Sequence, residues 1–191
     1  MIEEQLQEIM QIFEGIQLTL QDHIRISADI ITNAYKNGNK VLICGNGGSA
    51  ADAQHIAGEF MGQFKKDRAP LPAIALHTNT SYLTAVANDY GYKEVFARAV
   101  KALGRPGDVL IAISTSGNSD NVIQAVRVAK DMGIVTIALT GASGGLLGHI
   151  ADITIRIPSD NTPRIQEGHI AIGHIICSIV ENNLFGDNYD R

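Results

Sequence analysis

The stretch DVLIAISTSGNSDNVIQAVRVAK, residues 108–130, decides the fold. It begins with the short apolar run 108–113, which indicates a strand buried on both faces. It ends with residues 121–130, whose apolar positions have the spacing of a helix. A strand that leads into a helix through a short turn is the repeating unit of a parallel sheet covered by helices.

The turn between this strand and this helix is rich in hydroxyl groups. It contains Ser114, Thr115, Ser116 and Ser119, and Gly117 lets the backbone approach a ligand closely. A helix N-terminus attracts anions, and no lysine or arginine lies in the turn, so we expect neutral donors to hold an anion here. The alternative is an ordinary serine cap on the helix.

Bulk composition limits the classes of function. The chain has 191 residues, is 45% apolar and carries a net charge of −5. We expect a soluble cytoplasmic protein with no membrane span, and two reduced core cysteines, Cys44 and Cys177. The only dense basic stretch, 65–68, is expected to be a solvated helix end, so we predict no nucleic-acid binding.

Apolar patterning predicts short strands that mostly alternate with helices. The strands are expected at 40–44, 72–76, 109–113, 134–139 and 153–157. The helices are expected at 3–36, 49–64, 81–87, 93–103, 119–132 and 164–185. This order predicts an α/β fold, a three-layer sandwich around a parallel sheet, with ligands bound beyond the carboxyl ends of the strands. The loops that begin at Gly45, Ser114 and Thr140 are therefore expected to converge.

The opening and closing helices are unusually apolar. Isoleucines cover more than one stripe of the closing helix, and the opening stretch carries two apolar stripes. A helix that is apolar around most of its circumference is buried on several sides. We expect an oligomer interface to cover these helices, with a central core helix as the alternative.

A glycine-rich loop, CGNGGSA at residues 44–50, follows the first expected strand. It matches the loose pattern of dinucleotide-binding loops. A nicotinamide-binding fold also needs an acidic residue at the end of the next strand, but that strand ends at residues 76–79 with Leu-His-Thr-Asn. A small polar ligand therefore fits this loop better than a dinucleotide.

His55 and Glu59 lie four residues apart, on one face of a helix. The pair can supply two metal ligands or an oriented base, and its alternative is a solvent-facing ion pair. The closing helix offers Gln166, His169 and His174. Gln166 and His174 are eight residues apart, and the isoleucines around His174 predict that it is buried. The segment Asn88–Asp89 provides a further carboxylate in an expected loop.

These features together resemble one family. The motifs are CGNGGSAADAQH-x-x-x-E, PAIAL, ANDYG, GDVLIAISTSGNS, ALTG-x-x-GG, IRIPS and RIQE-x-H-x-x-x-x-H. They cover essentially the whole chain and resemble the sugar isomerase (SIS) domain family, and within it the enzymes that isomerise sedoheptulose 7-phosphate. The resemblance implies a five-stranded, flavodoxin-like parallel sheet formed by residues 37–191, and N-terminal helices at 1–36. It also implies a homotetramer with sites between subunits and one zinc ion per chain.

The resemblance further implies a role for each site residue. The phosphate would be held by Ser114, Thr115, Ser116 and Ser119. The rest of the substrate would meet Asn46, Gly47, Gly48, Ser49, Glu59, Asn88, Asp89 and Gln166. Zinc would be bound by His55, Glu59, Gln166 and His174. The product, D-glycero-D-manno-heptose 7-phosphate, would enter bacterial surface-heptose or lipopolysaccharide synthesis.

Aldose–ketose isomerisation agrees with these residue types. It moves a proton between adjacent carbons through an enediol, and therefore needs a base, an acid and a positive centre. Glu59 is the candidate base and His174 the candidate acid. A carboxylate bound to a metal is a poorer base than a free one, because the metal withdraws electron density. Either Glu59 and His174 therefore change coordination when substrate binds, or the metal is partly structural. Asp89 is kept as a residue that orients one of them or takes the proton.

Two other classes of function remain open from the sequence. A branch of the same family resembles a protein that associates with the replication initiator DnaA, and the tail at 181–185 resembles that branch as well. Its members typically lack the residue corresponding to Glu59 and depart from the serine loop, and this chain keeps both. A sugar-phosphate sensor without turnover is the other class.

Overall fold

Five strands form a single sheet in the computed structural model, which describes residues 1–186. Every neighbouring pair is parallel, and the order is β2-β1-β3-β4-β5. The strands are β1 (Val41–Cys44), β2 (Ala73–Ala75), β3 (Val109–Ile113), β4 (Val135–Thr140) and β5 (Ile153–Arg156). The predicted five-stranded parallel sheet is confirmed.

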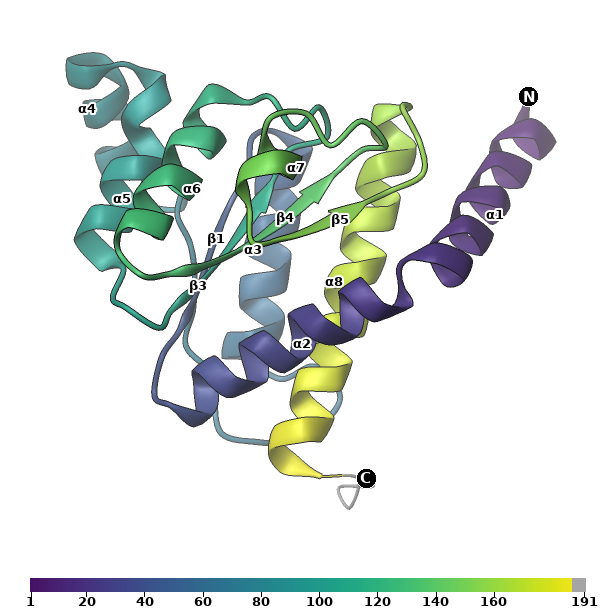
Figure 1. Ribbon diagram of the computed structural model, residues 1–191, viewed down its shortest axis with the longest axis horizontal. Coiled ribbons are helices and arrows are strands. Elements are labelled where there is room, and N and C mark those ends of the chain that lie inside the picture. The colour runs from purple at the N-terminus through teal and green to yellow at the C-terminus, as the bar shows by residue number, and fades with distance from the viewer. Residues whose placement is uncertain (187–191) are drawn as a thin grey trace.

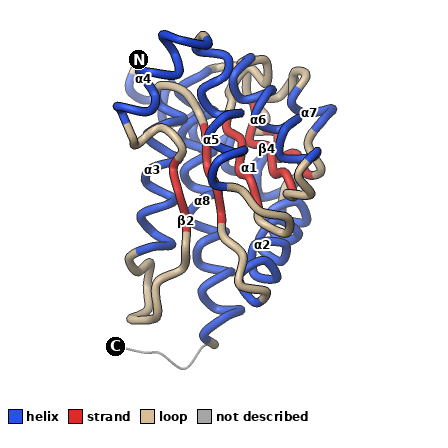
Figure 2. The backbone as a smooth tube through the Cα atoms, turned by 90° about the vertical axis from the view of Figure 1, so that its left-hand side faces the viewer, coloured by secondary structure: helices blue, strands red, loops and turns tan. Residues whose placement is uncertain are grey.

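Helices cover both faces of the sheet (Figures 1 and 2). They are α1 (Ile2–Thr19), α2 (Gln21–Lys36), α3 (Gly48–Met61), α4 (Thr80–Tyr90), the 3-10 helix η1 (Tyr92–Glu94), α5 (Val95–Leu103), α6 (Asp120–Asp131), α7 (Leu147–Ile150) and α8 (Thr162–Phe185). Alternate strand residues enter opposite cores, because successive side chains of a strand point to opposite faces. Val41 and Ile43 pack with α1, α2, α3 and α8, whereas Leu42 and Cys44 pack with α4 to α7.

The order of the strands reverses at β1. The chain leaves β1 through α3 to reach β2 on one side, and it later returns to β3 on the other side. Cys44 pairs with Ala112 in the parallel register, so the loops that follow β1 and β3 begin next to each other. This is the position at which open α/β sheets bind ligands.

The expected helix at residues 3–36 is divided at Leu20 into α1 and α2. The hydrogen bonding continues through the break, since the Leu20 N–H donates to the carbonyl of Ile16 and the Leu20 carbonyl accepts from the N–H of Ile24. Leu20 is neither glycine nor proline, so no residue type marked the bend. Figure 1 shows α2 crossing α8, on which it packs, while α1 extends away to one side.

Two predicted boundaries were wrong near the expected site. Helix α3 ends at Met61 rather than at residue 64, because the Arg68 side chain takes the last carbonyl groups of the helix. Helix α4 continues to Tyr90, so the segment Asn88–Asp89 lies in its last turn rather than in a loop. The short helix α7 was not predicted at all, and four residues are too few to show a helical period.

The basic stretch at residues 65–68 was expected to be a solvated helix end, and this prediction is wrong. It lies after α3, and Lys66 is buried, with its ammonium donating to the carbonyl of Gly186. The Arg68 side chain forms a buried ion pair with Glu181. Two of the basic groups are therefore used inside the molecule. Within residues 1–186, no helix has the length and apolarity needed to cross a bilayer.

His169, rather than His174, is the fully buried histidine of α8. Its Nε2 lies 3.1 Å from the carbonyl oxygen of Thr140, which can only accept, so Nε2 carries the proton and donates. The buried Nδ1 atom has no hydrogen-bond partner in the described chain. Burial disfavours the charged ring and lowers the pKa of His169 from 6.5 to about 4.

We therefore expect His169 to make the protein less stable in mild acid. As the pH is lowered below 6.5, His169 of the unfolded chain binds a proton, whereas His169 of the folded protein does not bind one until about pH 4. The free energy of unfolding therefore decreases as the pH is lowered from 6.5 to about 4. The contribution is about 3 kcal/mol across the window. Urea unfolding at fixed protein concentration should show a flatter dependence between pH 6.5 and 4 for His169→Gln than for the wild type. Equal pH dependence of the free energy of unfolding in the wild type and in His169→Gln would contradict the lowered pKa of His169.

Candidate active site

The glycine loop after β1 is fastened to the start of α6. The side-chain amides of Asn46 and Asn121 form a reciprocal pair, with two hydrogen bonds of 2.9 Å. The Tyr92 hydroxyl also donates to Oδ1 of Asn46, at 3.0 Å. Asn121 and Tyr92 were missed in the sequence, because neither lies in a recognisable motif. Together the three side chains fix the loops after β1 and β3 to each other, at the point where the strand order reverses.

Gly47 and Gly48 are exposed in this loop, whereas Ser49 is buried beneath it. The side chain of Gln166 packs against Gly48 so closely that a Cβ atom there would clash with its amide. The glycine is therefore required for the contact between α3 and α8 at this point. The structure thus brings Gln166 from α8 to the loop that was predicted to line the sugar.

The serine loop after β3 presents hydroxyl groups that the helix does not use. Ser119 is the N-cap residue of α6, yet its side chain makes no capping hydrogen bond. Its Oγ lies 3.0 Å from Oγ of Ser114, which is also 3.5 Å from Oγ of Ser116. The interpretation of the loop as an ordinary serine cap is therefore wrong. Three hydroxyl groups instead cluster at the N-terminal end of the helix.

The loop after β4 closes over the serine loop. Gly117 has a positive φ of 67°, and a Cβ atom there would clash with the backbone of Gly144. The Leu146 N–H donates to Oδ1 of Asn118 at 2.9 Å, and the Gly141 N–H donates to the carbonyl of Thr115 at 2.9 Å. The predicted convergence of the three loops is confirmed.

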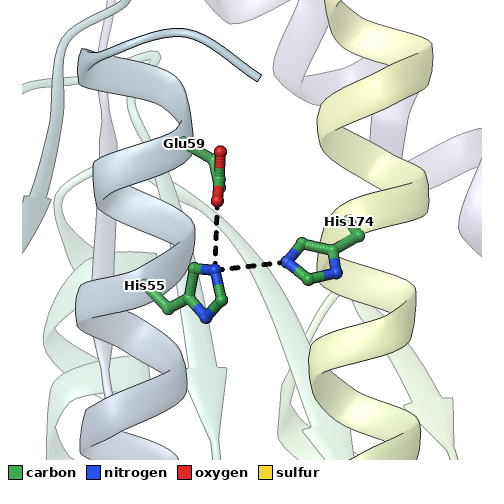
Figure 3. Close-up of side chains that lie close together, drawn as sticks. All are labelled: His55, Glu59 and His174. Atoms are coloured by element: carbon green, nitrogen blue, oxygen red, sulfur yellow. Dashed lines mark hydrogen bonds and ion pairs between the residues drawn. The ribbon is translucent and has the colours of Figure 1, made fainter. Parts of the chain in front are cut away.

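A second cluster, His55, Glu59 and His174, joins α3 to α8 (Figure 3). Nε2 of His55 lies 3.0 Å from Oε1 of Glu59 and 3.3 Å from Nε2 of His174. All three side chains are at least partly exposed, so the predicted burial of His174 is wrong. Ile172 and Ile176 pack into the core and Ile175 is exposed, while the ring of His174 faces α3.

The donor set of this cluster fits a divalent transition metal. One ligand atom from each residue lies within 4.8 Å of the others, and two imidazoles with one carboxylate are common zinc ligands. In the structure, the N–H group at Nε2 of His55 can donate a shared hydrogen bond to the carboxylate of Glu59 and to Nε2 of His174. A cation in that place would be met by lone pairs from all three residues.

The cluster borders an open hollow on the exposed face of α3. Gly58 and Gly62 lie in its wall, and neither has a side chain to fill it. His55 lies seven residues after Gly48, which places it about 10 Å along the helix from the glycine loop. The glycine loop and the cluster of His55, Glu59 and His174 thus lie about two turns apart on α3.

Asn88 and Asp89 are not joined to either cluster by a hydrogen bond or ion pair of the described chain. Both are exposed on α4, and the amide of Asn88 donates to Oδ1 of Asp89 at 2.9 Å. Helix α4 packs on the face of the sheet opposite to α3 and α8. Any role for Asp89 therefore needs substrate or another subunit to bridge the gap.

Comparison with known proteins identifies the family. The family model of the SIS domain matches residues 5–141. A phosphoheptose isomerase of Clostridium acetobutylicum is 55% identical over 170 residues, which are 89% of this chain and 87% of the relative. One of Aneurinibacillus thermoaerophilus is 50% identical over 191 residues, covering 98% of this chain and 96% of the relative.

Solved structures give the same result for the fold. A phosphoheptose isomerase from Neisseria gonorrhoeae has a TM-score of 0.90 at 42% identity, covering 95% of this chain and 97% of the other. One from Francisella tularensis has a TM-score of 0.92 at 41% identity, covering 95% of this chain and 96% of the other. The chain therefore belongs to the SIS domain family, in the branch of the phosphoheptose isomerases.

Proposed function

We propose that this chain isomerises sedoheptulose 7-phosphate to D-glycero-D-manno-heptose 7-phosphate. The observation that carries the proposal is the cluster of Glu59, His55 and His174, which supplies a carboxylate base beside two imidazoles. The relatives at 50–55% identity, which are named for this activity, support it. The product would supply surface-heptose or lipopolysaccharide synthesis. Two free buried cysteines favour a cytoplasmic site of action.

The reaction transfers one proton between neighbouring carbons. In this mechanism Glu59 removes a proton from C1 of the ketose, and His174 protonates the oxygen on C2 to give the enediol. Return of a proton to C2 and loss of the C1 hydroxyl proton then give the aldehyde. Fixed donors around the two oxygens stabilise the charge that develops there. Asp89 is the other candidate for the proton transfer.

Glu59→Gln keeps the volume of the side chain but removes the base. We expect kcat to fall by about 10²–10⁴-fold while KM changes much less, because general-base catalysis contributes that factor. The deciding measurement is exchange of deuterium from solvent into C1 of the sugar phosphate, with Asp89→Asn tested in parallel. Wild-type exchange in Glu59→Gln, with exchange lost in Asp89→Asn, would transfer the role to Asp89.

The same assay separates the three classes of function. A sensor would bind the sugar phosphate without exchange, and an initiator-binding module would show neither binding nor exchange. In the structure, three of the five residues of the tail that resembles the initiator-associated branch pack inward, while Asn182 and Asn183 are exposed. Glu181 is buried in its ion pair with Arg68, and Leu184 and Phe185 pack against the core. Glu181, Leu184 and Phe185 therefore have a packing role within this fold.

We propose that the serine loop binds the phosphate group. Support comes from the clustered hydroxyls of Ser114, Ser116 and Ser119 at the start of α6, none of which caps the helix, with Thr115 beside them. No cationic side chain is needed, because the helix end and the hydroxyl dipoles supply the positive potential.

Ser116→Ala should weaken binding without unfolding the protein, since Ser116 is exposed. A hydrogen bond to a charged group contributes about 1.5–3 kcal/mol, so KM should rise roughly tenfold or more. Ser81→Ala, on the exposed start of α4, is the matched control and should leave KM unchanged. A KM for Ser116→Ala equal to that of the wild type would remove this loop from the site.

We propose that His55, Glu59 and His174, with Gln166, hold one zinc ion per chain. When bound, zinc would polarise the carbonyl of the substrate as a Lewis acid. Protein purified without chelator should contain about one equivalent of zinc, and chelation should abolish turnover until zinc is restored. Elemental analysis that finds no metal, together with full activity in chelator, would contradict the proposal.

We propose a homotetramer in which the N-terminal segment, 1–36, joins the SIS domain, 37–191, to neighbouring copies. An apolar groove between α1, α2 and α8 supports this, and its lining includes Met10, Phe13, Ile24, Ile175 and Ile179. Leu6, Met10 and Phe13 are exposed along α1, and free apolar patches of this kind mark interaction surfaces. Light scattering at micromolar concentration should give the mass of four chains, and a monodisperse monomer would contradict the assembly.

A further inference from the structure

The segment that follows α3 is fastened to α8 by a buried ion pair. Nε of Arg68 donates to Oε1 of Glu181 at 2.9 Å, and both side chains are only 2% exposed. Glu181 also accepts the backbone N–H groups of Phe64 and Lys65, at 3.3 and 3.0 Å. One carboxylate thus holds three donors of the same segment.

The remaining donors of Arg68 reach the end of α3. They bond the carbonyl oxygens of Glu59 and Phe60, each at 2.9 Å, and that of Ala69 at 3.1 Å. These carbonyl groups lie where the helix ends and its own N–H donors run out, and that of Phe60 also accepts the N–H of Leu71 at 3.0 Å. The guanidinium therefore fixes the backbone of Glu59, whose side chain belongs to the histidine cluster.

The same segment also touches the other helix of the cluster. The ring of Phe64 stacks on the ring of His174, with centroids 5.5 Å apart and 27° between the planes. The ring of His55 meets His174 edge-on, with centroids 4.9 Å apart. Glu181 lies seven residues after His174, which is about 20° around the helix and therefore on the same face.

Stability alone does not account for such a pair. Removing two charges from water costs several kcal/mol per ion, and apolar replacements of buried ion pairs are often neutral or stabilising. An ion pair does, however, impose directions and distances that an apolar contact does not. Here Arg68 fixes the backbone of Glu59 through its carbonyl group, and the segment held by Glu181 places the Phe64 ring against His174.

We propose that Phe64, Arg68 and Glu181 are positioning residues for the cluster of His55, Glu59 and His174. The ion pair fixes the end of α3 and the segment after it, and Phe64 then fixes the plane of the His174 ring. Residues that orient metal ligands typically change metal affinity by about 10–100-fold when they are replaced. The inference rests on the zinc site of the proposed function.

The test measures zinc affinity of metal-stripped protein by competition with a chelating dye. Phe64→Leu removes the stacked ring, and Glu181→Gln weakens the ion pair while keeping its shape. We expect each to bind zinc at least about tenfold more weakly than the wild type. Phe64→Tyr keeps the ring, and its hydroxyl can reach solvent because Phe64 is partly exposed, so it should retain wild-type affinity.

A second ion pair, which is partly buried, provides the control. Lys40 and Asp108 lie 2.6 Å apart just before β1 and β3, at the amino edge of the sheet. Asp108→Asn should lower the thermal unfolding temperature but leave zinc affinity unchanged. Equal loss of affinity in Asp108→Asn would show a global effect and overturn the inference. If Glu181→Gln does not fold, the comparison of Phe64→Leu with Phe64→Tyr decides.

The outcomes separate this inference from the proposed function. If the wild type binds zinc and Phe64→Leu binds it equally well, the positioning role is overturned while the metal site stands. If the wild type binds no zinc, the metal site falls and the positioning role falls with it, while deuterium exchange still tests the isomerase.

Discussion

The parallel pairing of β1 with β3 is the constraint on which the rest of the molecule depends. It puts two strand ends side by side at the point where the sheet order reverses, so two loops from distant parts of the chain start together. The helices that follow these loops, α3 and α6, lie on opposite faces of the sheet, so neither covers the space between the two strand ends. The paired amides of Asn46 and Asn121 then fix the loops to each other.

The close packing of α3 on α8 is the second requirement, and it depends on small residues. A Cβ atom at Gly173 would come within 2.8 Å of two side-chain carbons of Ile56, and one at Gly48 would clash with Gln166. These glycines let the helices approach until an imidazole of α8 reaches an imidazole of α3. The candidate chemistry is thus built on rigid elements rather than on mobile loops, which favours fixed distances.

The basic side chains of residues 65–68 do not lie in the serine loop. The proposed phosphate site consists of hydroxyl groups and a helix end, without a cationic side chain in the serine loop. The buried cations of the 65–68 stretch are instead directed to carbonyl groups and to Glu181. A guanidinium suits this task because its planar fork can donate to several oxygens at fixed angles. Composition shows that these residues are basic, but only their partners show what they bind.

The sequence by itself determined the sheet, the positions of its strands and the family. Uninterrupted β-branched runs and 3.6-residue periods are local properties, and strand β3 was predicted to the residue. The motifs also selected the side chains that later proved to cluster, because His55 and Glu59 share a helical face whatever surrounds them. Burial of His174 was predicted wrongly, since neighbouring residue types do not tell which way one ring points.

Only the tertiary structure decided which distant groups meet. The approach of His174 to His55 spans 119 residues, and the contact of Arg68 with Glu181 spans 113. The end of α3 at Met61, the bend at Leu20 and the use of Ser119 outside a helix cap have the same origin. Each depends on partners brought by the packing of whole elements, and no local pattern records those partners.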